Sequence, residues 1–470
     1  MDSSSARLLI CSSEGGAAVE LSILPSTSTS CSTGLVYDSR VCAHANPEGD
    51  HPEHPERVTS LWSAVRDGGL ASHCVSVPAR LATRAEVELV HEVQHWDRIE
   101  WAVGQELNAI TAFAARHESL YLNSASLDAA CCAAGGVLEL TTKVVTGQVR
   151  NGMALVRPPG HHAEAHAAMG FSVFNTVAMA AQHARSKLGC RRVLIVDWDV
   201  HHGNGIQHIF EADPDVLYFS VHRYESGRYF PSSDMGIGSD GSPTSSGVKE
   251  GLGTTINIGW NTKGSPKPGD AEYLAAWRDV LMPVAREFDP DLVIVAAGFD
   301  AAEGDPIGRC RCTPDCYASL TSDLMTLAGG KVVLALEGGY SLSATAVSAA
   351  ACMEALIGVR RPLQGKNSTG AAAATAAPVE KPRLRPRAQP KSRFQQHMMA
   401  QAAMRREAPA APEDACDKGA RKAIEETRQV HAQYWRCLRS STAAPFVAAA
   451  APLSDAEQLA NRLNNIDLAS

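Results

Sequence analysis

The stretch RVLIVDWDVHHGNG, residues 192–205, decides how this chain folds and where its chemistry lies. Residues 193–196 are β-branched or aliphatic, which is typical of a buried strand in a parallel sheet. Within six residues the strand is followed by two carboxylates and two imidazoles: Asp197, Asp199, His201 and His202. Such groups are costly to leave unpaired beside an apolar core. Because side chains two apart share a strand face, Asp199 and His201 are expected to face one object, most simply a divalent metal ion.

Apolar strand-like runs alternate with helical patterns on both sides of this stretch. Strands are predicted at 35–37, 154–156, 193–196, 216–221, 255–258, 292–296 and 332–336. Helices are predicted at 57–65, 84–118, 125–146, 172–187, 204–211, 270–287, 313–328 and 341–357. This alternation indicates an α/β fold, with an open, mostly parallel sheet and helices on both faces. The Gly/Ser-rich residues 223–253 are predicted to form a surface loop over a site.

Composition divides the chain into four predicted parts. They are a disordered N-terminal segment (1–33), one large domain (34–360), a basic Ala/Pro-rich linker (361–414) and C-terminal helical segments (415–470). Helices are expected at 416–438 and from Ser454 onward, where Glu457 completes a capping-box pattern, and both are interpreted as docking or oligomerisation helices. KPRLRPRAQPKSR (381–393) carries six basic residues. A nuclear-import or nucleic-acid patch and a solvated linker are equally good interpretations of it.

Charge is distributed unevenly along the chain. From Arg360 to the end there are 18 Lys/Arg against 10 Asp/Glu, which leaves 25 against 41 before that point. An acidic body suits a cationic substrate, although a merely soluble surface explains it equally well. No apolar run reaches the roughly 18 residues of a membrane span, and no secretory signal pattern begins the chain. Thirteen cysteines, an odd and modest number, favour a reducing compartment, the nucleus and/or cytoplasm.

Polar residues follow four of the predicted strands at their carboxyl ends. They are the pair His161-His162, the run from Asp197 to His201, Asp300, and the run from Glu337 to Tyr340. Ligands of open parallel sheets bind outside the carboxyl ends of the strands. The four segments are therefore expected to meet in one crevice.

Asp199, His201 and Asp300 together offer two oxygen ligands and one nitrogen ligand. Three protein ligands with open positions are typical of a catalytic zinc ion, whereas structural zinc sites usually have four. Fe(II) and Mn(II) remain alternatives, because this donor set is not soft enough to exclude them. The alternative role of Asp300 is a helix N-cap, and that of His201 is a buried core histidine.

The tandem histidines and Tyr340 supply the remaining chemistry. His161 and His162 follow Pro158-Pro159-Gly160, a stiff turn that fixes the direction of both rings. A histidine near an activated water takes its proton and later passes it to a leaving amine. Tyr340 follows two glycines, so its phenol is placed to stabilise a developing oxyanion. Packing of Tyr340 against the next helix is the alternative.

Five of these segments resemble the class II histone deacetylases, which are zinc-dependent and have the arginase/deacetylase fold. The matching segments are RPPGHHAE, GFSVFN, DWDVHHGNG, AGFDAAEGDP and LEGGY, with GLVYD and HPEHPER near the start. The resemblance covers about 34–358, and 416–438 is similar to the C-terminal segment of some plant class II members, which suggests a plant- or alga-type member. It implies hydrolysis of N6-acetyl-lysine in histones or other proteins, release of acetate, and a role in chromatin regulation and transcriptional repression.

The resemblance also implies roles for individual residues. Asp199, His201 and Asp300 match the zinc ligands, and His161 and His162 match the catalytic histidines, with His162 favoured as the general base. Tyr340 matches the transition-state tyrosine. Phe171 and Phe230 match the aromatic walls of an acetyl-lysine tunnel, and Asp197 and Asn204 match the residues that orient the two histidines.

Potassium binding and subclass are implied in the same way. One potassium site would use Asp197, Asp199, His201, Ser220 and Val221, and a second would use backbone oxygens of Phe210, Asp213, Val216 and Thr254. Weakly active relatives carry His where this chain has Tyr340, so an active enzyme is favoured. Polyamine-selective relatives carry an acidic gatekeeper where this chain has Ile307, which argues against an acetylpolyamine substrate.

Other functions remain open at this point. One alternative substrate is a non-histone cytosolic protein such as tubulin. Another alternative is that the chain is a small-molecule amidohydrolase or an arginase-like dimanganese enzyme. A second metal ion would need a further carboxylate, and Asp305 is the one close to Asp300. A non-enzymatic alternative is an acetyl-lysine binding module that recruits co-repressors. No membrane and no sequence-specific nucleic acid is expected as partner. Cys310, Cys312 and Cys316 raise the hypothesis of a redox or second metal site.

Overall fold

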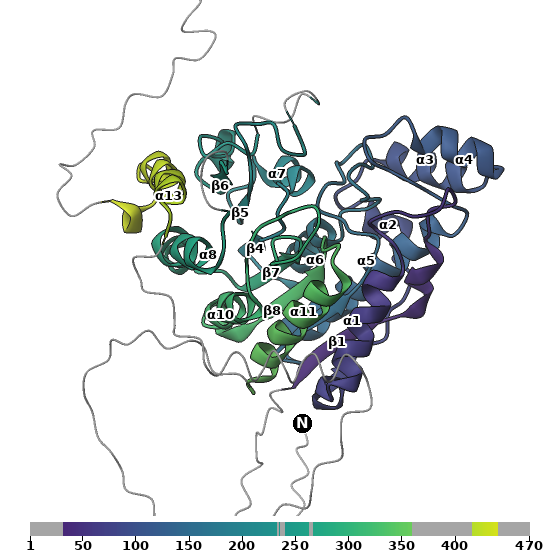
Figure 1. The fold of residues 1–470 in the computed structure, drawn as a ribbon, viewed down its shortest axis with the longest axis horizontal. Coiled ribbons are helices and arrows are strands. Elements are labelled where there is room, and N and C mark those ends of the chain that lie inside the picture. Colours follow the sequence, from purple (N-terminus) through teal and green to yellow (C-terminus); the bar gives the residue numbers. More distant parts are fainter. Residues whose placement is uncertain (1–31, 233–234, 236–239, 263–266, 360–415, 440–470) are drawn as a thin grey trace, which may run out of the picture. The chain divides into compact units, whose positions relative to one another are not determined.

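A single eight-stranded sheet forms the centre of the chain in this computed structural model, which describes residues 32–232, 235, 240–262, 267–359 and 416–439 (Figure 1). The sheet order is β2-β1-β3-β8-β7-β4-β5-β6, and every strand pairing in the described sheet is parallel. The strands are β1 (Thr33–Tyr37), β2 (Cys74–Ser76), β3 (Asn151–Leu155), β4 (Val193–Asp197), β5 (Val216–Arg223), β6 (Thr255–Trp260), β7 (Leu292–Ala297) and β8 (Val332–Leu336).

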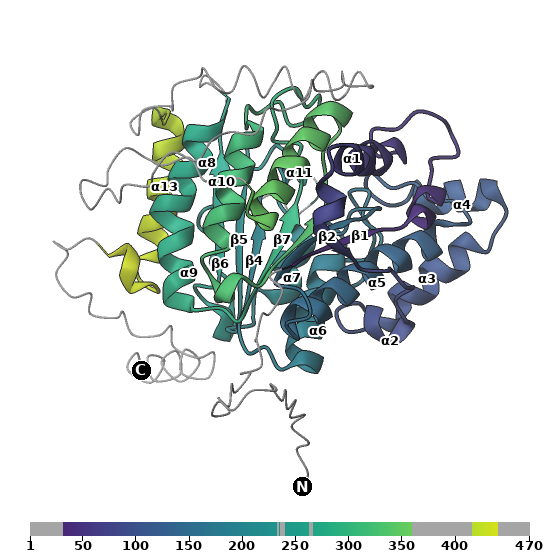
Figure 2. The same cartoon turned by 90° about the horizontal axis from the view of Figure 1, so that it is seen from below.

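Helices cover both faces of this sheet (Figure 2). One face carries α1 (Glu56–Asp67), α8 (Asp270–Ala276), α9 (Met282–Phe288), α10 (Pro314–Leu324) and α11 (Leu342–Ile357). The other carries α5 (Ser126–Val145) and α6 (Thr176–Leu188), with α7 (Asn204–Phe210) close by. The predicted α/β fold is confirmed, and it explains why the four apolar residues of β4 are fully buried.

The strand order explains the convergence that the sequence predicted. β3, β8, β7 and β4 are consecutive in the sheet, and each is followed by one of the four polar segments. Since parallel strands end at the same edge, segments that are up to 180 positions apart in sequence leave the sheet side by side.

Three predictions about elements were wrong in detail. Residues 84–118 are three helices, α2 (Arg84–Val87), α3 (Val93–Val103) and α4 (Leu107–Ala114), rather than one. The first break occurs because Glu92 N–H donates to the Ala165 carbonyl instead of continuing the helix. The short strand β2 was not predicted. The N-terminal segment predicted to be disordered (1–33) extends too far, because Thr33 belongs to β1, where its hydroxyl donates to Asn151.

A C-terminal helix, α13 (Lys418–His431), packs beside the edge strand β6. The Thr427 hydroxyl donates to the Asn257 carbonyl of β6 at 2.8 Å, and the Trp435 indole N–H donates to the Gly253 carbonyl at 2.8 Å. The predicted docking helix at 416–438 therefore docks on the chain's own sheet. The predicted linker, the basic stretch 381–393 and the helix from Ser454 lie outside the described residues, and the division into domains stays a prediction. Within the described part, no helix has both the length and the apolarity to cross a membrane.

Candidate metal centre and catalytic site

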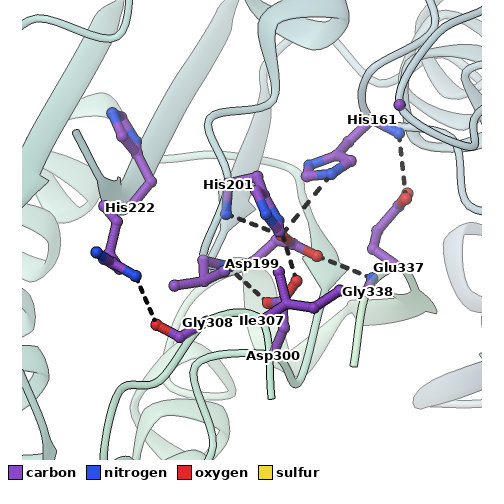
Figure 3. Close-up of polar contacts among 12 residues, drawn as sticks. His161, Asp199, His201, His222, Asp300, Ile307, Gly308, Glu337 and Gly338 are labelled. Carbon is purple, nitrogen blue, oxygen red and sulfur yellow. Dashed lines mark hydrogen bonds and ion pairs between the residues drawn. The ribbon is translucent and has the colours of Figure 1, made fainter. Parts of the chain in front are cut away.

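Asp199, His201 and Asp300 form a buried cluster, called here the ligand triad (Figure 3). One potential ligand atom from each residue lies within 4.8 Å of the others. The His201 Nδ1 atom is 3.0 Å from an Asp199 oxygen and 3.1 Å from an Asp300 oxygen, so one ring nitrogen faces both carboxylates. Among the described residues, this is the one group of three or more His, Cys, Asp or Glu side chains close enough to hold a metal ion.

Asp199 and His201 were predicted to face one metal ion because alternate residues of a strand share a face. That reason was wrong, because β4 ends at Asp197. Asp199 and His201 lie in the loop beyond it, where carboxylates hold the backbone: Asp197 accepts from Asp199 N–H at 3.1 Å, and Asp199 accepts from His201 N–H at 2.9 Å. Asp300 similarly accepts from Val200 N–H at 2.7 Å, which ties the end of β7 to this loop. The loop is thus organised by the side chains that carry the chemistry.

Two glycines let the neighbouring backbone approach the ligand triad. A Cβ atom on Gly298 would lie 2.0 Å from an Asp199 oxygen, and one on Gly338 would lie 2.3 Å from an Asp300 oxygen. Gly338 N–H donates to Asp199 at 2.8 Å. The glycines of AGFD and LEGGY are therefore needed for space around the carboxylates.

The charges of the ligand triad fit a divalent cation. Burial, followed by the negative charge of Asp199, raises the pKa of Asp300 to about 7. Burial alone would lower the pKa of His201, but its hydrogen bonds to Asp199 and Asp300 raise it to about 9. A cation between them would stabilise two carboxylates that are fully buried side by side, and two oxygens with one nitrogen form a donor set that suits zinc while leaving coordination positions open.

The tandem histidines lie next to the triad and have opposite charge preferences. His161 Nδ1 is 3.0 Å from an Asp197 oxygen, and His162 Nδ1 is 2.8 Å from Asn204 Oδ1, so Asp197 and Asn204 lie where the resemblance expected them. Although burial opposes it, the charges of Asp197 and Asp199 raise the pKa of His161 to about 10. Burial and the neighbouring charge of His161 lower the pKa of His162 well below its usual value. His162 is the neutral member of the pair.

Comparison with known proteins agrees with this geometry. Residues 51–356 match the Histone deacetylase domain family. This chain belongs to the histone deacetylase family. Histone deacetylase 5 of Arabidopsis thaliana is 45% identical over 329 residues, covering 69% of this chain and 49% of that protein. Polyamine deacetylase HDAC10 of Homo sapiens is 46% identical over 330 residues, covering 69% and 48%.

A solved structure supports the same family assignment. The crystal structure of the HDA15 HD domain matches with a TM-score of 0.69 and 33% identity, covering 87% of this chain and 97% of that chain. The chain spans about half the length of the two curated relatives named above. The family assignment therefore rests on the domain that contains the ligand triad.

Tyr340 of this histone deacetylase domain is held from two sides. Asp305 accepts hydrogen bonds from Tyr340 N–H at 2.7 Å and Ser341 N–H at 3.2 Å, while the Arg57 guanidinium lies over the phenol ring, 5.1 Å from its centre. Burial and the charge of Asp300 raise the pKa of Tyr340 well above its usual value, so the phenol keeps its proton. Asp305, considered above as an additional metal ligand, instead holds the backbone before α11.

Aromatic rings flank the histidines. Phe230 lies edge-on to His162 at 5.0 Å and to His201 at 5.9 Å between ring centres, and Phe171 lies edge-on to Tyr340 at 6.1 Å. Tyr229 stacks on His201 at 5.3 Å, and its hydroxyl donates to the Ile307 carbonyl at 3.1 Å. Phe230 therefore lies beside His201, Phe171 lies beside Tyr340, and Ile307 is linked to His201 through Tyr229. The role of Phe171, Phe230 and Ile307 as tunnel walls stays a prediction.

The residues named for potassium form two groups, one around Asp197 at the end of β4 and one in the turn between α7 and β5. Ser220 on β5 pairs in register with Asp197, and its hydroxyl is 2.8 Å from His222 Nδ1. Phe210, Asp213 and Val216 form a turn in which Asp213 N–H donates to the Phe210 carbonyl and Val216 N–H to the Asp213 carbonyl. Thr254 joins this turn through its hydroxyl, 3.4 Å from the Asp213 carbonyl.

Sequence reasoning missed a buried cluster that supports the site, called here the arginine cluster: Glu53, Arg57, Tyr121 and Arg157. Glu53 receives hydrogen bonds from Arg57 at 3.0 Å and from Arg157 at 2.8 and 2.6 Å, and all three side chains are fully buried. Arg57 also donates to the carbonyls of Glu337 and Gly339, at 2.5 and 2.6 Å. The cluster thereby fixes the LEGGY turn that precedes Tyr340. Its one sequence signal was charged residues inside the matching segments HPEHPER and RPPGHHAE.

Glu337 was also given no role by the sequence. Its carboxylate accepts from Gly160 N–H at 2.6 Å and His161 N–H at 3.1 Å, and burial raises its pKa to about 7. It joins the loop after β8 to the loop of the tandem histidines.

The hypothesis of a second metal site at Cys310, Cys312 and Cys316 is not supported. Within the described residues, no metal-binding group of three includes them. All three are buried free thiols, and burial raises the pKa of Cys310 to about 12 and that of Cys312 well above its usual value. Thiolates, which bind metals and oxidise readily, are disfavoured in such surroundings.

Proposed function

We propose that this chain hydrolyses N6-acetyl-lysine in proteins with one zinc ion held by the ligand triad. The observation that carries the proposal is the meeting of the triad, a neutral histidine and a protonated phenol at the ends of four adjacent strands. Zinc, when bound, would polarise the acetyl carbonyl and make the attacking water more acidic.

The chain's own residues supply the proton transfers in this proposal. His162, which is neutral, accepts a proton from the attacking water as the new C–O bond forms. The Tyr340 O–H donates a hydrogen bond to the carbonyl oxygen as negative charge develops on it. His162 then returns the proton to the lysine nitrogen as the C–N bond breaks, which yields acetate and a free lysine. His161, with its raised pKa, balances the charge of Asp197 and Asp199 throughout.

An acetyl-lysine side chain suits the surroundings of the triad. The rings of Phe171 and Phe230 are placed to contact a four-carbon stem, and Ile307 offers no carboxylate to attract the amines of a polyamine. The name of the human relative gives polyamine deacetylation as the activity of that protein. We therefore favour an acetylated protein such as a histone tail, with tubulin and other cytosolic proteins as alternatives.

The proposal also covers the cellular role, partners and location of the protein, and the binding of potassium ions. A role in transcriptional repression, co-repressor partners and a location in the nucleus and/or cytoplasm are proposed from the family and the cysteine count. Potassium is proposed at the two sets named above. The pairing of Ser220 with Asp197 supports the first, and the turn of backbone carbonyls at 210–216 supports the second.

Removal of metal should abolish turnover, and zinc should restore it. A chelator-treated chain is expected to release no acetate from an acetyl-lysine histone-tail peptide, and one equivalent of zinc per chain should recover activity. Acetate release and metal content by mass spectrometry measure the two quantities. The variant Asp300→Asn should lose both, whereas the control Asp323→Asn on α10 should keep both.

Three results would refute this proposal. They are turnover without metal, a requirement for two manganese ions per chain, and turnover of acetylated polyamines but not of acetyl-lysine peptides. The second would favour an arginase-like enzyme and the third a small-molecule amidohydrolase.

A further inference from the structure

A chain of hydrogen bonds leads from His162 through Asn204 and Glu164 to His208 on α7. Asn204 Oδ1 is 2.8 Å from His162 Nδ1, and Asn204 Nδ2 donates to Glu164 Oε1 at 2.5 Å. His208 Nδ1 then lies 2.9 and 3.1 Å from the two Glu164 oxygens. Asn204 is fully buried and Glu164 is 8% exposed, so solvent does not replace the hydrogen bond between them.

The direction of each hydrogen bond in this chain is determined. An ionised carboxylate only accepts, so Glu164 requires the amide nitrogen of Asn204 to face it. The other two neighbours of that nitrogen, the His162 carbonyl at 3.3 Å and the Met169 sulfur at 3.4 Å, are also acceptors. The amide oxygen must therefore face His162, and His162 Nδ1 must carry the hydrogen.

This direction matters for the reaction. A neutral imidazole with its hydrogen on Nδ1 has its free lone pair on Nε2, which is the form that accepts a proton from water. If Asn204 turned over, its N–H would face Nδ1, the hydrogen would move to Nε2, and the lone pair would point away from the reacting atoms.

We propose that Glu164 is a positioning residue, which fixes the orientation of Asn204 and through it the proton-accepting tautomer of His162. The inference rests on the proposed function, in which His162 is the base. It gives the final residue of RPPGHHAE a role distinct from that of the two histidines beside it.

His208 also holds Glu164, through contacts with both carboxylate oxygens. Its Nε2 atom is 3.1 Å from an Asp240 oxygen, so the ring bridges two carboxylates. Burial opposes its charge, but the hydrogen bonds to Asp240 and Glu164 raise the pKa of His208 to about 10. A cationic His208 donates from both nitrogens, which keeps the Glu164 oxygens as acceptors toward Asn204.

The first test replaces Glu164 with its amide isostere. Glu164→Gln replaces one of the two acceptor oxygens with an NH2 donor and removes the negative charge opposite His208, so Asn204 is no longer held in one orientation. The kcat for an acetyl-lysine peptide should then fall about 10- to 100-fold while KM stays within about twofold. Glu272→Gln on α8, an equally buried glutamate that accepts from the backbone of Gly269 and Asp417, is the matched control and should leave kcat unchanged.

The second test exchanges the charge between the two positions. Asn204→Asp alone sets two carboxylates against each other and should be nearly inactive. In the double variant Asn204→Asp/Glu164→Gln, the new glutamine amide donates to one oxygen of the new carboxylate at position 204, and the other oxygen accepts from His162 Nδ1–H. Both hydrogen bonds can form again: the bond between positions 204 and 164 has its direction reversed, and the bond from His162 Nδ1–H keeps its direction, so the double variant should recover most of the kcat lost in each single variant.

A spectroscopic measurement separates this inference from the proposed function. The ¹⁵N shifts of His162 in the histidine-labelled chain should report a hydrogen on Nδ1 in the parent and the double variant, and loss of that preference in Glu164→Gln. This readout does not require turnover, so an inactive parent chain would refute the proposed function without deciding the inference. An unchanged tautomer and unchanged kcat in Glu164→Gln, or a double variant worse than both single variants, would overturn the inference.

Discussion

Replacing Tyr340 with phenylalanine is expected to lower kcat for an acetyl-lysine peptide about 10²- to 10³-fold, the effect of removing one oxyanion donor. The ring would keep its contacts with Arg57 and Phe171, because neither involves the hydroxyl. Tyr340 does not belong to the ligand triad, so zinc content should stay at one per chain.

The control for this variant is Tyr317→Phe. Tyr317 is also buried, and its hydroxyl has no hydrogen-bond partner among the described residues, so the same deletion there should change neither kcat nor zinc content. A loss of zinc in Tyr340→Phe would contradict the role assigned to Tyr340, and undiminished kcat would show that the hydroxyl does not stabilise the transition state.

Glu53→Gln is expected to destabilise the fold by about 3–5 kcal/mol, because it removes the one carboxylate between two buried arginines. Denaturant unfolding measures the loss, and Glu56→Gln is the control. Glu56 is three residues along the chain and largely exposed, so its pairing with His54 should contribute no more than about 1 kcal/mol. Activity should fall with Glu53→Gln as well, since Arg57 holds the turn before Tyr340.

The effect of Glu53 should also depend on pH. Burial alone would raise the pKa of Glu53, but the charges of Arg157 and Arg57 hold it well below its usual range. Glu53 therefore stabilises the fold fully above about pH 4.3, the pKa of a glutamate in the unfolded chain. This stabilisation is lost as the pH falls from there toward the lower pKa of Glu53 in the folded chain. The difference in unfolding free energy between the parent and Glu53→Gln should shrink below that pH. A difference that grows on acidification would contradict the pairing.

The sequence was sufficient for seven of the eight strands and for the ligand triad, because apolar runs and the polar residues that follow them can be recognised locally. Buried parallel strands appear as apolar runs such as 193–196, and polar residues at four strand ends lead to one edge of the sheet. The meeting of Asp199 and His201 was predicted for the wrong reason, since hydrogen bonds in the loop hold them, and no periodicity describes such a loop.

What the sequence did not predict depends on contacts between distant loops. Glu53 and Arg157 are separated by 104 positions, and nothing in their spacing indicates that both are buried and paired. The orientation of Asn204 depends on Glu164, 40 positions away. The first break in the helix predicted at 84–118 likewise depends on a backbone contact with Ala165. These contacts form only in the tertiary fold, so the secondary-structure propensities of neighbouring residues do not predict them.

The central claim is that Asp199, His201 and Asp300 hold one zinc ion at the point where the four strands end. Crystals of the zinc-loaded chain, measured at and below the zinc absorption edge, test this most directly. The expected result is a single anomalous peak within bonding distance of His201 Nδ1 and of one oxygen from each aspartate. A peak elsewhere, or none at this position in an active preparation, would contradict the account.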